Sequence, residues 1–294
     1  MRTKPGPTTR LLLAGLAAVL TGCATQPQKT GTAPVAVLSV PPDIPEPRLP
    51  QPMPAPAPAQ RTIDPGPVIG AARAIEPATT LGAVVLDRTT RAELLAIEPD
   101  RQFRAASLVK LLIAIDVLSH GADDRLRDRI STMLRVSNDG IASDLWSRAG
   151  GPELVRRTSN ALGLTGTHPP ADPGQWGDVL LTARDVVRVY DHVLTTLPEP
   201  DRTLIVGALA GAPRVAADGF DQHFGIPAGL PGQQWAIKQG WSNSARDISL
   251  HTSGLVGADW RYVVVVLTEH PRQVAWKVAA KSVTAATQAL AAAF

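Results

Sequence analysis

The most apolar stretch of the chain covers residues 104–118, where aliphatic residues occupy every side of a predicted helix. Its polar side chains are concentrated at the beginning, so the pattern predicts a helix buried in the middle of a domain. Two β-rich runs, residues 81–86 and 93–97, flank a polar turn upstream of this helix and predict a hairpin.

Downstream of the buried helix, amphipathic patterns predict four further helices, over residues 124–136, 141–149, 152–162 and 182–194. They are followed by three β-type runs and an alanine-rich helix, at residues 234–239, 248–255, 261–268 and 273–293. Because two strands precede the helices and three follow them, we expect all five in one antiparallel sheet. The predicted fold class is α+β, with helices on the sheet and a helical lobe beside it.

The chain begins with a basic segment and a short apolar stretch at residues 11–20, which is the layout of a secretory signal. The stretch leads into Leu20-Thr21-Gly22-Cys23, which resembles the lipobox of bacterial lipoproteins. The resemblance implies that residues 1–22 are a signal peptide and that the Cys23 thiol carries a lipid such as palmitate. We therefore expect a lipoprotein anchored at the extracytoplasmic face of the cell membrane. The alternative is a plain signal peptide with an accidental cysteine.

Residues 23–67 are dense in Pro, Ala, Gln and Thr and lack an apolar run long enough to pack. This composition favours an extended tether, which at about 3.1 Å per residue would reach on the order of 100 Å. A Pro-rich ligand for a recognition domain is the alternative interpretation. The folded domain is expected at residues 68–294.

Composition limits the partners that this domain can have. Cys23 is the only cysteine, so the domain holds no internal disulfide and no thiolate metal site. The net charge is +3 and no Lys/Arg cluster alternates with aromatic residues, so we expect no nucleic-acid partner. No histidine stands at ligand spacing from another histidine or an acid, and His223, His251 and His270 are interpreted as structural or surface groups. We expect a monomer without metal or cofactor.

Ser107 and Lys110, at the start of the buried helix, are the candidate chemistry of the chain. Their spacing puts both side chains on one helical face, where the amine can take the hydroxyl proton. In the first turn, free backbone N–H groups and the helix dipole stabilise negative charge nearby. The pair meets the requirements of an acyl-serine nucleophile, although an S-x-x-K spacing alone is a weak signal.

Two further segments extend this pair into a pattern. Ser137-Asn138-Asp139 lies at a break between two predicted helices, and Lys238-Gln239-Gly240 lies on a predicted strand. In this order the three segments resemble the S-x-x-K, S-D-N and K-T-G motifs of the penicillin-recognising serine enzymes, which are β-lactamases, D,D-peptidases and related esterases. The domain also looks like that of alanine-rich actinobacterial lipoproteins with a β-lactamase-like domain.

The resemblance implies a β-lactamase/transpeptidase-like fold and a role for each motif residue. Ser107 would be the nucleophile, and Lys110 its base, kept deprotonated by burial and neighbouring positive charge. Ser137 would be the relay that protonates the leaving group. Lys238 would hold Ser137 and attract a substrate carboxylate, while the backbone N–H groups of Ser107 and Trp241 would form the oxyanion hole. The implied substrate-binding residues are Asp139, Lys238, Gln239, Trp241 and Arg246, the last as a second carboxylate clamp.

Three departures from the family pattern bear on activity. Asp139 replaces an amide, so it cannot donate to a substrate carbonyl, and it is expected to raise the pKa of Lys110 and weaken it as a base. Gln239 replaces a hydroxyl that meets the substrate carboxylate. No E-x-x-L-N segment occurs between residues 163 and 178, which leaves Asp172 as the only acidic candidate for deacylation.

Two functional hypotheses stay open. The first is a serine hydrolase that acts on cell-wall peptides, β-lactams or esters, with poor β-lactam turnover. The second is a lipid-anchored protein that keeps the fold and binds cell-wall components or an envelope partner. Retention of all four motif side chains favours the hydrolase, whereas Asp139 and Gln239 favour the binding protein. The segment from 107 to 137 is shorter than in most relatives, so we expect a reduced helical lobe and an open cleft.

Overall fold

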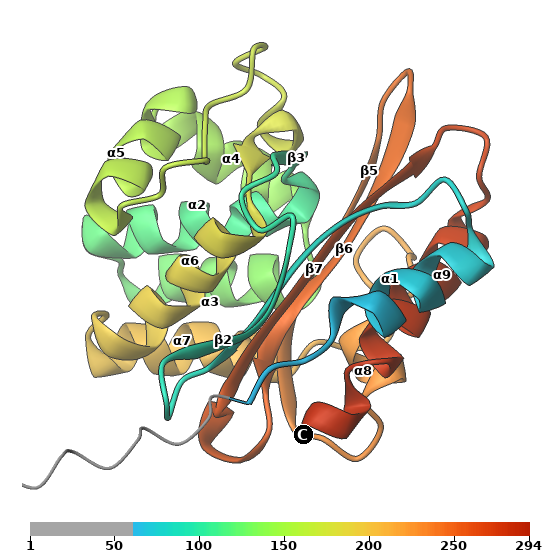
Figure 1. Ribbon diagram of the computed structural model, residues 1–294. Coiled ribbons are helices and arrows are strands. Elements are labelled where there is room, and N and C mark those ends of the chain that lie inside the picture. Colours follow the sequence, from blue (N-terminus) through green and yellow to red (C-terminus); the bar gives the residue numbers. More distant parts are fainter. Residues whose placement is uncertain (1–60) are drawn as a thin grey trace, which may run out of the picture. The chain divides into compact units, whose positions relative to one another are not determined.

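The computed structural model describes residues 61–294, and its centre is a five-stranded antiparallel sheet (Figure 1). The strands lie in the spatial order β2-β1-β7-β6-β5. Their bounds are β1 Thr80–Asp87, β2 Ala92–Ile97, β5 Trp235–Asn243, β6 Asp247–Val256 and β7 Tyr262–Pro271. The early and late strands join where β1 pairs with β7, with Val84 opposite Val265. The predicted α+β class is confirmed, as is the prediction that all five strands share one antiparallel sheet.

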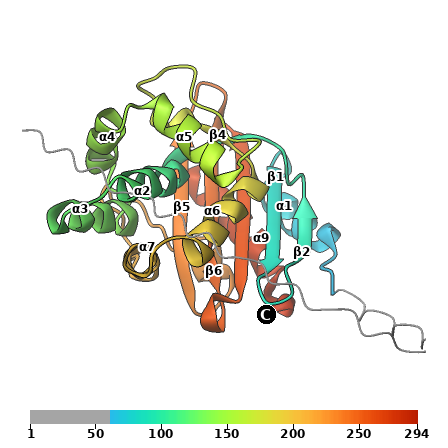
Figure 2. The same ribbon diagram turned by 90° about the vertical axis from the view of Figure 1, so that its left-hand side faces the viewer.

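Helices cover both faces of this sheet (Figures 1 and 2). One face packs against α1 (Pro65–Ile75) and α9 (Trp276–Gln288), and the other against α6 (Ala183–Thr195) and the helical lobe. Along β7, Val263 and Val265 belong to the core on the lobe side, whereas Val264 and Val266 belong to the core under α1 and α9. A strand buried on both faces needs apolar residues at every position, which accounts for the uninterrupted valine run.

The buried helix of the sequence pattern is α2 (Val109–Ser119), which follows a single 3-10 turn, η1 (Ala106–Leu108). All of its residues except Val117 and Ser119 are buried. Around it lie the other helices of the lobe, which are α3 Asp124–Arg135, α4 Asp139–Arg148, α5 Pro152–Leu162 and α7 Glu199–Ala210. Neighbouring helices and the sheet enclose α2. The turn η1 at its start lies against β5, so the polar residues there are placed between the lobe and the sheet.

Several short or proline-led elements were not predicted from the sequence. Helix α1 begins at Pro65, with the Asp64 carboxylate accepting a hydrogen bond from the Gly66 backbone N–H, so the expected tether boundary at residue 67 passes through this helix. Helix α7 also has proline in its first turn. Proline fits the first turn of a helix because the N–H that it lacks has no partner there. The remaining short elements are β3 Phe103–Arg104, β4 Leu180–Leu181 and α8 Ile226–Gly229.

The expected signal peptide, the Cys23 lipidation site and most of the Pro-rich segment lie outside the described residues. Within residues 61–294, no helix combines the length and apolar character that a membrane crossing requires.

His251 on β6 is a structural histidine, as interpreted from the sequence. It is fully buried, its Nε2 lies 2.8 Å from the Arg104 carbonyl oxygen, and its Nδ1 accepts a hydrogen bond from the Thr268 backbone N–H at 3.1 Å. A ring that accepts at one nitrogen and donates at the other must be neutral. Burial accordingly lowers the pKa of His251 to about 4.

We therefore expect acid to destabilise the domain through His251. At pH values between the pKa of His251 in the unfolded chain and its lower pKa in the folded domain, His251 is protonated only in the unfolded chain. The free energy of unfolding therefore falls as the pH falls. The loss from this group between pH 7 and pH 5 is about 2 kcal/mol. Urea unfolding at both pH values checks this: His251→Gln should reduce the difference and the exposed His168→Gln should not. An unchanged difference in His251→Gln would contradict the assignment.

Candidate active site

The structure brings four of the predicted site residues into one hydrogen-bonded cluster. Lys110 Nζ lies 2.5 Å from Ser107 Oγ and 3.4 Å from Ser137 Oγ, and Lys238 Nζ lies 2.9 Å from Ser137 Oγ. Lys110 is 0% exposed and Lys238 is 1% exposed. Lys110 also donates to Asp139 Oδ1 at 2.6 Å, while the side chain of Asp139 is 61% exposed. The two serines and the two amines thus form a continuous chain beneath the surface, with one carboxylate at its edge.

Unusual backbone conformations position both serines. Ala106, which precedes the nucleophile candidate, has φ 46°, and Ser137, between α3 and α4, has φ 54°. Residues other than glycine adopt this left-handed region at a cost that surrounding structure must offset, and such residues gather at functional sites. Asn138 caps α4, with Oδ1 accepting from the Ile141 backbone N–H at 2.9 Å. The reversed Asn-Asp order therefore gives the amide a capping role and directs the carboxylate to Lys110.

Gly240 lets strand β5 lie directly against the nucleophile turn. A Cβ atom at this position would stand 3.1 Å from the Ala105 carbonyl oxygen and 3.3 Å from Leu108 Cγ. Such contacts are tighter than ordinary packing, so a glycine favours this close approach. The next residue on the strand is Trp241, which lines the same cleft as Ser107.

Burial sets the protonation of the two lysines. The pKa of Lys110 lies below its ordinary value because burial disfavours the ammonium form, and Asp139 opposes this shift. Burial and the neighbouring Lys110 charge lower the pKa of Lys238 well below its ordinary value. The expected contact between Asp139 and Lys110 is present, and the carboxylate raises the pKa of Lys110 as expected, but burial outweighs it and the net shift is downward. Burial thus favours the neutral form of the amine next to Ser107 Oγ, which is the form that a general base needs.

Replacing Asp139 with Asn should make Lys110 a more readily deprotonated base. Loss of the carboxylate removes the attraction that favours the ammonium form, so the pKa of Lys110 falls further. We expect the pH profile of acylation to move to lower pH, with a gain of about threefold to tenfold near neutral pH. The rate of acylation by an activated ester across the pH range measures this, with the exposed Asp172→Asn as control. An unchanged or lower rate in folded Asp139→Asn would contradict this electrostatic account.

An aromatic residue that the sequence analysis missed covers Lys110. Lys110 Nζ lies 4.5 Å from the centroid of the Trp176 ring, and Trp176 Nε1 donates to Ser143 Oγ at 3.1 Å. Trp176 comes from the loop after α5. The Gly and Pro residues there indicate a loop, but nothing in the sequence predicts that this side chain points toward Lys110. Asp172, the acidic candidate in this loop, is exposed and accepts a hydrogen bond from the Gly174 backbone N–H. It does not line the cleft.

The cleft above the cluster has a volume of about 550 Å³. Three indoles and three carboxylates contribute to its wall together with Ser107: Trp176, Trp241, Trp276, Asp139, Asp178 and Asp218. Asp178 lies 3.8 Å from Arg104 Nη1, and Asp218 Oδ2 accepts from Trp241 Nε1 at 2.9 Å. Sequence reasoning identified only Ser107, Asp139 and Trp241 among these groups, because the others come from separate loops and from α9.

Two predicted substrate-binding residues lie elsewhere. Gln239 is 1% exposed, and its Nε2 donates to the carbonyl oxygens of Gln222 and Phe224 at 2.9 and 2.7 Å. Strand alternation sends it to the face opposite Lys238, so its amide holds a loop instead of lining the cleft. Arg246 is exposed in the turn between β5 and β6 and is not part of the cleft wall.

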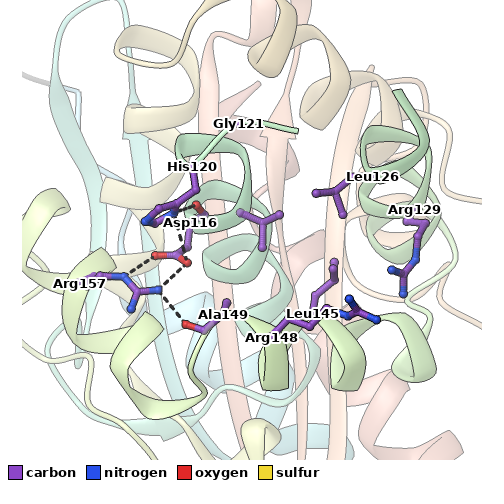
Figure 3. A pocket seen from close by; sticks show the side chains of 10 residues that line it. Asp116, His120, Gly121, Leu126, Arg129, Leu145, Arg148, Ala149 and Arg157 are labelled. Atoms are coloured by element: carbon purple, nitrogen blue, oxygen red, sulfur yellow. Dashed lines mark hydrogen bonds and ion pairs between the residues drawn. The ribbon is translucent and has the colours of Figure 1, made fainter. Parts of the chain in front are cut away.

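A second cavity, of about 530 Å³, lies in the helical lobe around the end of α2 (Figure 3). Asp116 from α2 accepts two hydrogen bonds from Arg157, at 3.1 and 2.8 Å, and Arg157 also donates to the Ala149 carbonyl oxygen. No serine, threonine or cysteine lines this cavity in the described structure. The two cavities are similar in size, so size does not identify the active site. Of the two, only the cleft at Ser107 places a nucleophile next to a base.

The fold is that of the class A β-lactamases and of PBP-A. The β-lactamase from Sphaerobacter thermophilus gives a TM-score of 0.62 at 20% identity, covering 78% of this chain and 98% of its own. The β-lactamase from Streptomyces albus G gives 0.61 at 19% identity, covering 77% and 97%. PBP-A gives 0.63 at 16% identity, covering 79% and 97%. At these identities the likeness shows the fold, and it confirms the β-lactamase/transpeptidase-like architecture expected from the three motifs.

No protein-family model matches the sequence. A protein described as "Putative lipoprotein LppW" from Mycobacterium tuberculosis is 34% identical over 202 residues, which cover 65% of this chain and 64% of that protein. The protein of the same name from Mycobacterium bovis matches to the same extent. The chain thus spans 64% of the length of these relatives.

Proposed function

We propose that the domain is an acyl-serine enzyme in which Ser107 attacks the carbonyl of an ester, peptide or β-lactam of low molecular weight. The observation that carries the proposal is the 2.5 Å contact between Ser107 Oγ and the fully buried amine of Lys110. Burial lowers the pKa of this amine below its ordinary value, which favours the neutral form that a base needs, and a hydroxyl at this distance needs no rearrangement to lose its proton.

In the proposed acylation, Lys110 takes the Ser107 proton while Oγ forms a bond to the substrate carbonyl carbon. The oxyanion is held by the backbone N–H groups of Ser107 and Trp241. Collapse of the intermediate breaks the bond to the leaving group, which receives a proton through Ser137. This hydroxyl stands between the two lysines, 3.4 Å from Lys110 Nζ and 2.9 Å from Lys238 Nζ. Lys238 is therefore assigned to hold Ser137 in place.

We expect acylation to outpace deacylation. Release of the acyl group needs a water molecule next to a base, but Trp176 covers Lys110, and Asp172 is turned into its own loop. A 4-nitrophenyl ester should therefore give a burst of nitrophenol close to one equivalent, followed by a slow steady state. The burst should vanish in Ser107→Ala and persist in Ser147→Ala, which removes an exposed hydroxyl from α4. A burst that persists in Ser107→Ala would contradict the assignment of Ser107 as the nucleophile.

We also propose that Cys23 anchors the protein in the membrane at the extracytoplasmic face. The lipobox-like sequence and the likeness to a protein named as a lipoprotein support this placement. Cys23→Ser should move the protein from the membrane fraction to the soluble fraction without changing the thermal unfolding of the domain. The matched control is Ser39→Ala, in the Pro-rich segment, which should stay with the membrane. Full retention of Cys23→Ser in the membrane fraction would contradict the anchor.

Two observations support a lipoprotein that binds cell-wall components without turnover as the second candidate. Asp139 occupies one hydrogen-bonding position on Lys110, and Trp176 lies over the same amine. Both favour a retained, charged amine over a free base. In that case neither the burst nor an effect of Asp139→Asn on acylation would appear.

A further inference from the structure

Carboxylates dominate the polar rim of the cleft at Ser107. Asp139, Asp178 and Asp218 line it, and all three are exposed or partly exposed. Asp218 accepts hydrogen bonds from Trp241 Nε1 at 2.9 Å and from the Phe220 backbone N–H at 3.0 Å. Within residues 61–294 it has no cationic side chain within 4.0 Å. Its orientation is therefore fixed by two neutral donors, while its negative charge acts on the cleft and also raises the pKa of the buried Lys110 and Lys238.

The cationic groups nearby lie below the cleft surface. Lys110 pairs with Asp139 at 2.6 Å, and Lys238 Nζ lies 5.8 Å from the centroid of the Trp241 ring. Lys238 is 1% exposed and donates to Ser137 Oγ and to the Gln239 carbonyl oxygen, both at 2.9 Å. Arg104 binds Asp247 and Ser249, and it approaches Asp178 only to 3.8 Å. No lysine or arginine is part of the cleft wall in the described structure. A ligand in the cleft thus meets carboxylates first.

Aromatic side chains form the wall next to Asp218. The Trp241 ring stacks on Phe220, with centroids 4.8 Å apart and planes at 13°, and Phe220 packs edge-on against Trp276 at 5.7 Å. Indole faces attract cations, and the attraction grows where water is excluded. Fixed carboxylates beside rigid indoles are a combination that recognises an amine or a quaternary ammonium group.

We infer that the acyl substrate of Ser107 carries a positively charged ammonium group, which lies against Asp218 and Trp241. That Ser107 is acylated rests on the proposed function. That the cleft binds an ammonium group is argued from the cleft wall alone. The inference runs against the expectation of a substrate carboxylate, because the carboxylate of a penicillin or peptide would approach the carboxylates of Asp178 and Asp218 at the rim. Asp218 is a specificity residue in this account and takes no part in proton transfer.

Three 4-nitrophenyl esters of equal chain length test the preference in acylation: one ending in trimethylammonium, one in a methyl group and one in a carboxylate. We expect the cationic ester to acylate about tenfold faster than the neutral ester, and the anionic ester about tenfold slower, with both differences shrinking in high salt. Asp218→Asn should reduce the ratio of the cationic-ester rate to the neutral-ester rate severalfold. Asp221→Asn, three residues away and outside this cleft, should change nothing. Equal rates for all three esters would overturn the inference and leave the enzyme proposal standing.

Binding of a non-reactive cation tests recognition of the ammonium group without any chemistry. Benzyltrimethylammonium should change the tryptophan fluorescence of the wild-type domain, bind more weakly to Asp218→Asn and bind normally to Asp221→Asn, while phenylacetate should not bind. If no ester acylates but this pattern holds, the enzyme proposal fails and cation recognition stands. If benzyltrimethylammonium and phenylacetate bind alike, or neither binds, the inference is wrong.

Discussion

Replacing Lys110 with Met is expected to slow acylation of Ser107 by about a thousandfold and to leave the domain folded. General-base catalysis by a positioned side chain is worth about 10² to 10⁴ in rate, and Lys110 is the base candidate in hydrogen-bonding contact with Ser107 Oγ. Met has nearly the same length as Lys, so the core keeps its volume. The buried amine is absent, so the free-energy cost of removing it from water is absent too. The burst rate with a 4-nitrophenyl ester measures the effect.

The matched control for this substitution is Lys277→Met, which removes an exposed amine on α9. Its burst rate should equal that of the wild type. Circular dichroism and urea unfolding should show that Lys110→Met is folded with unchanged or higher stability. A burst rate in Lys110→Met within threefold of the wild type would assign the proton to another acceptor and remove the basis of the mechanism.

The largest loss of stability is expected from Arg157→Met, at about 2 to 3 kcal/mol, because Asp116 is buried although Arg157 itself is 37% exposed. Arg157 pairs through two hydrogen bonds with Asp116, whose side chain is only 4% exposed on the central helix α2 (Figure 3). Removing the guanidinium leaves a carboxylate buried without its partner. Urea unfolding at neutral pH measures the change in the free energy of unfolding.

Arg156→Met is the control for this loss, because Arg156 is a neighbour on α5 whose pair with Glu153 is exposed on both sides. It should change the free energy of unfolding by less than about 0.5 kcal/mol. Adding Asp116→Asn to Arg157→Met should recover part of the loss, because the buried charge is then gone. Equal stability of the two methionine variants would show that the buried pair contributes nothing.

Sequence pattern predicted the sheet and the buried helix because their signals are strong. The valine run of β7 and the helix after Ser107 are apolar without interruption, and such stretches have few alternatives to a core. Helix α1 was missed because its first turn was assigned to the Pro-rich tether, and no helix was predicted at α7; in both helices proline occupies the first turn.

At the site, the spacing of the three motifs predicted which side chains meet, and it predicted the contact of Asp139 with Lys110. It also predicted the opposing effects of burial and of Asp139 on the pKa of Lys110. It could not predict that Trp176, from a loop more than sixty residues away in sequence, lies over the amine. Gln239 was placed in the cleft by analogy with a hydroxyl. A longer amide reaches the carbonyl oxygens of Gln222 and Phe224 on the opposite face.

The central claim, that Ser107 forms an acyl-enzyme, is tested most directly by the intact mass of the purified domain after mixing with an activated ester and, separately, with a penicillin. The account predicts that the ester adds the mass of one acyl group, that peptide mapping places it on Ser107, and that Ser107→Ala stays unmodified. The penicillin should add much less, because its carboxylate faces the acidic rim. Lys238→Ala should form less adduct, because Ser137 loses its support. An unmodified mass with both reagents, in a domain shown to be folded, would contradict the account.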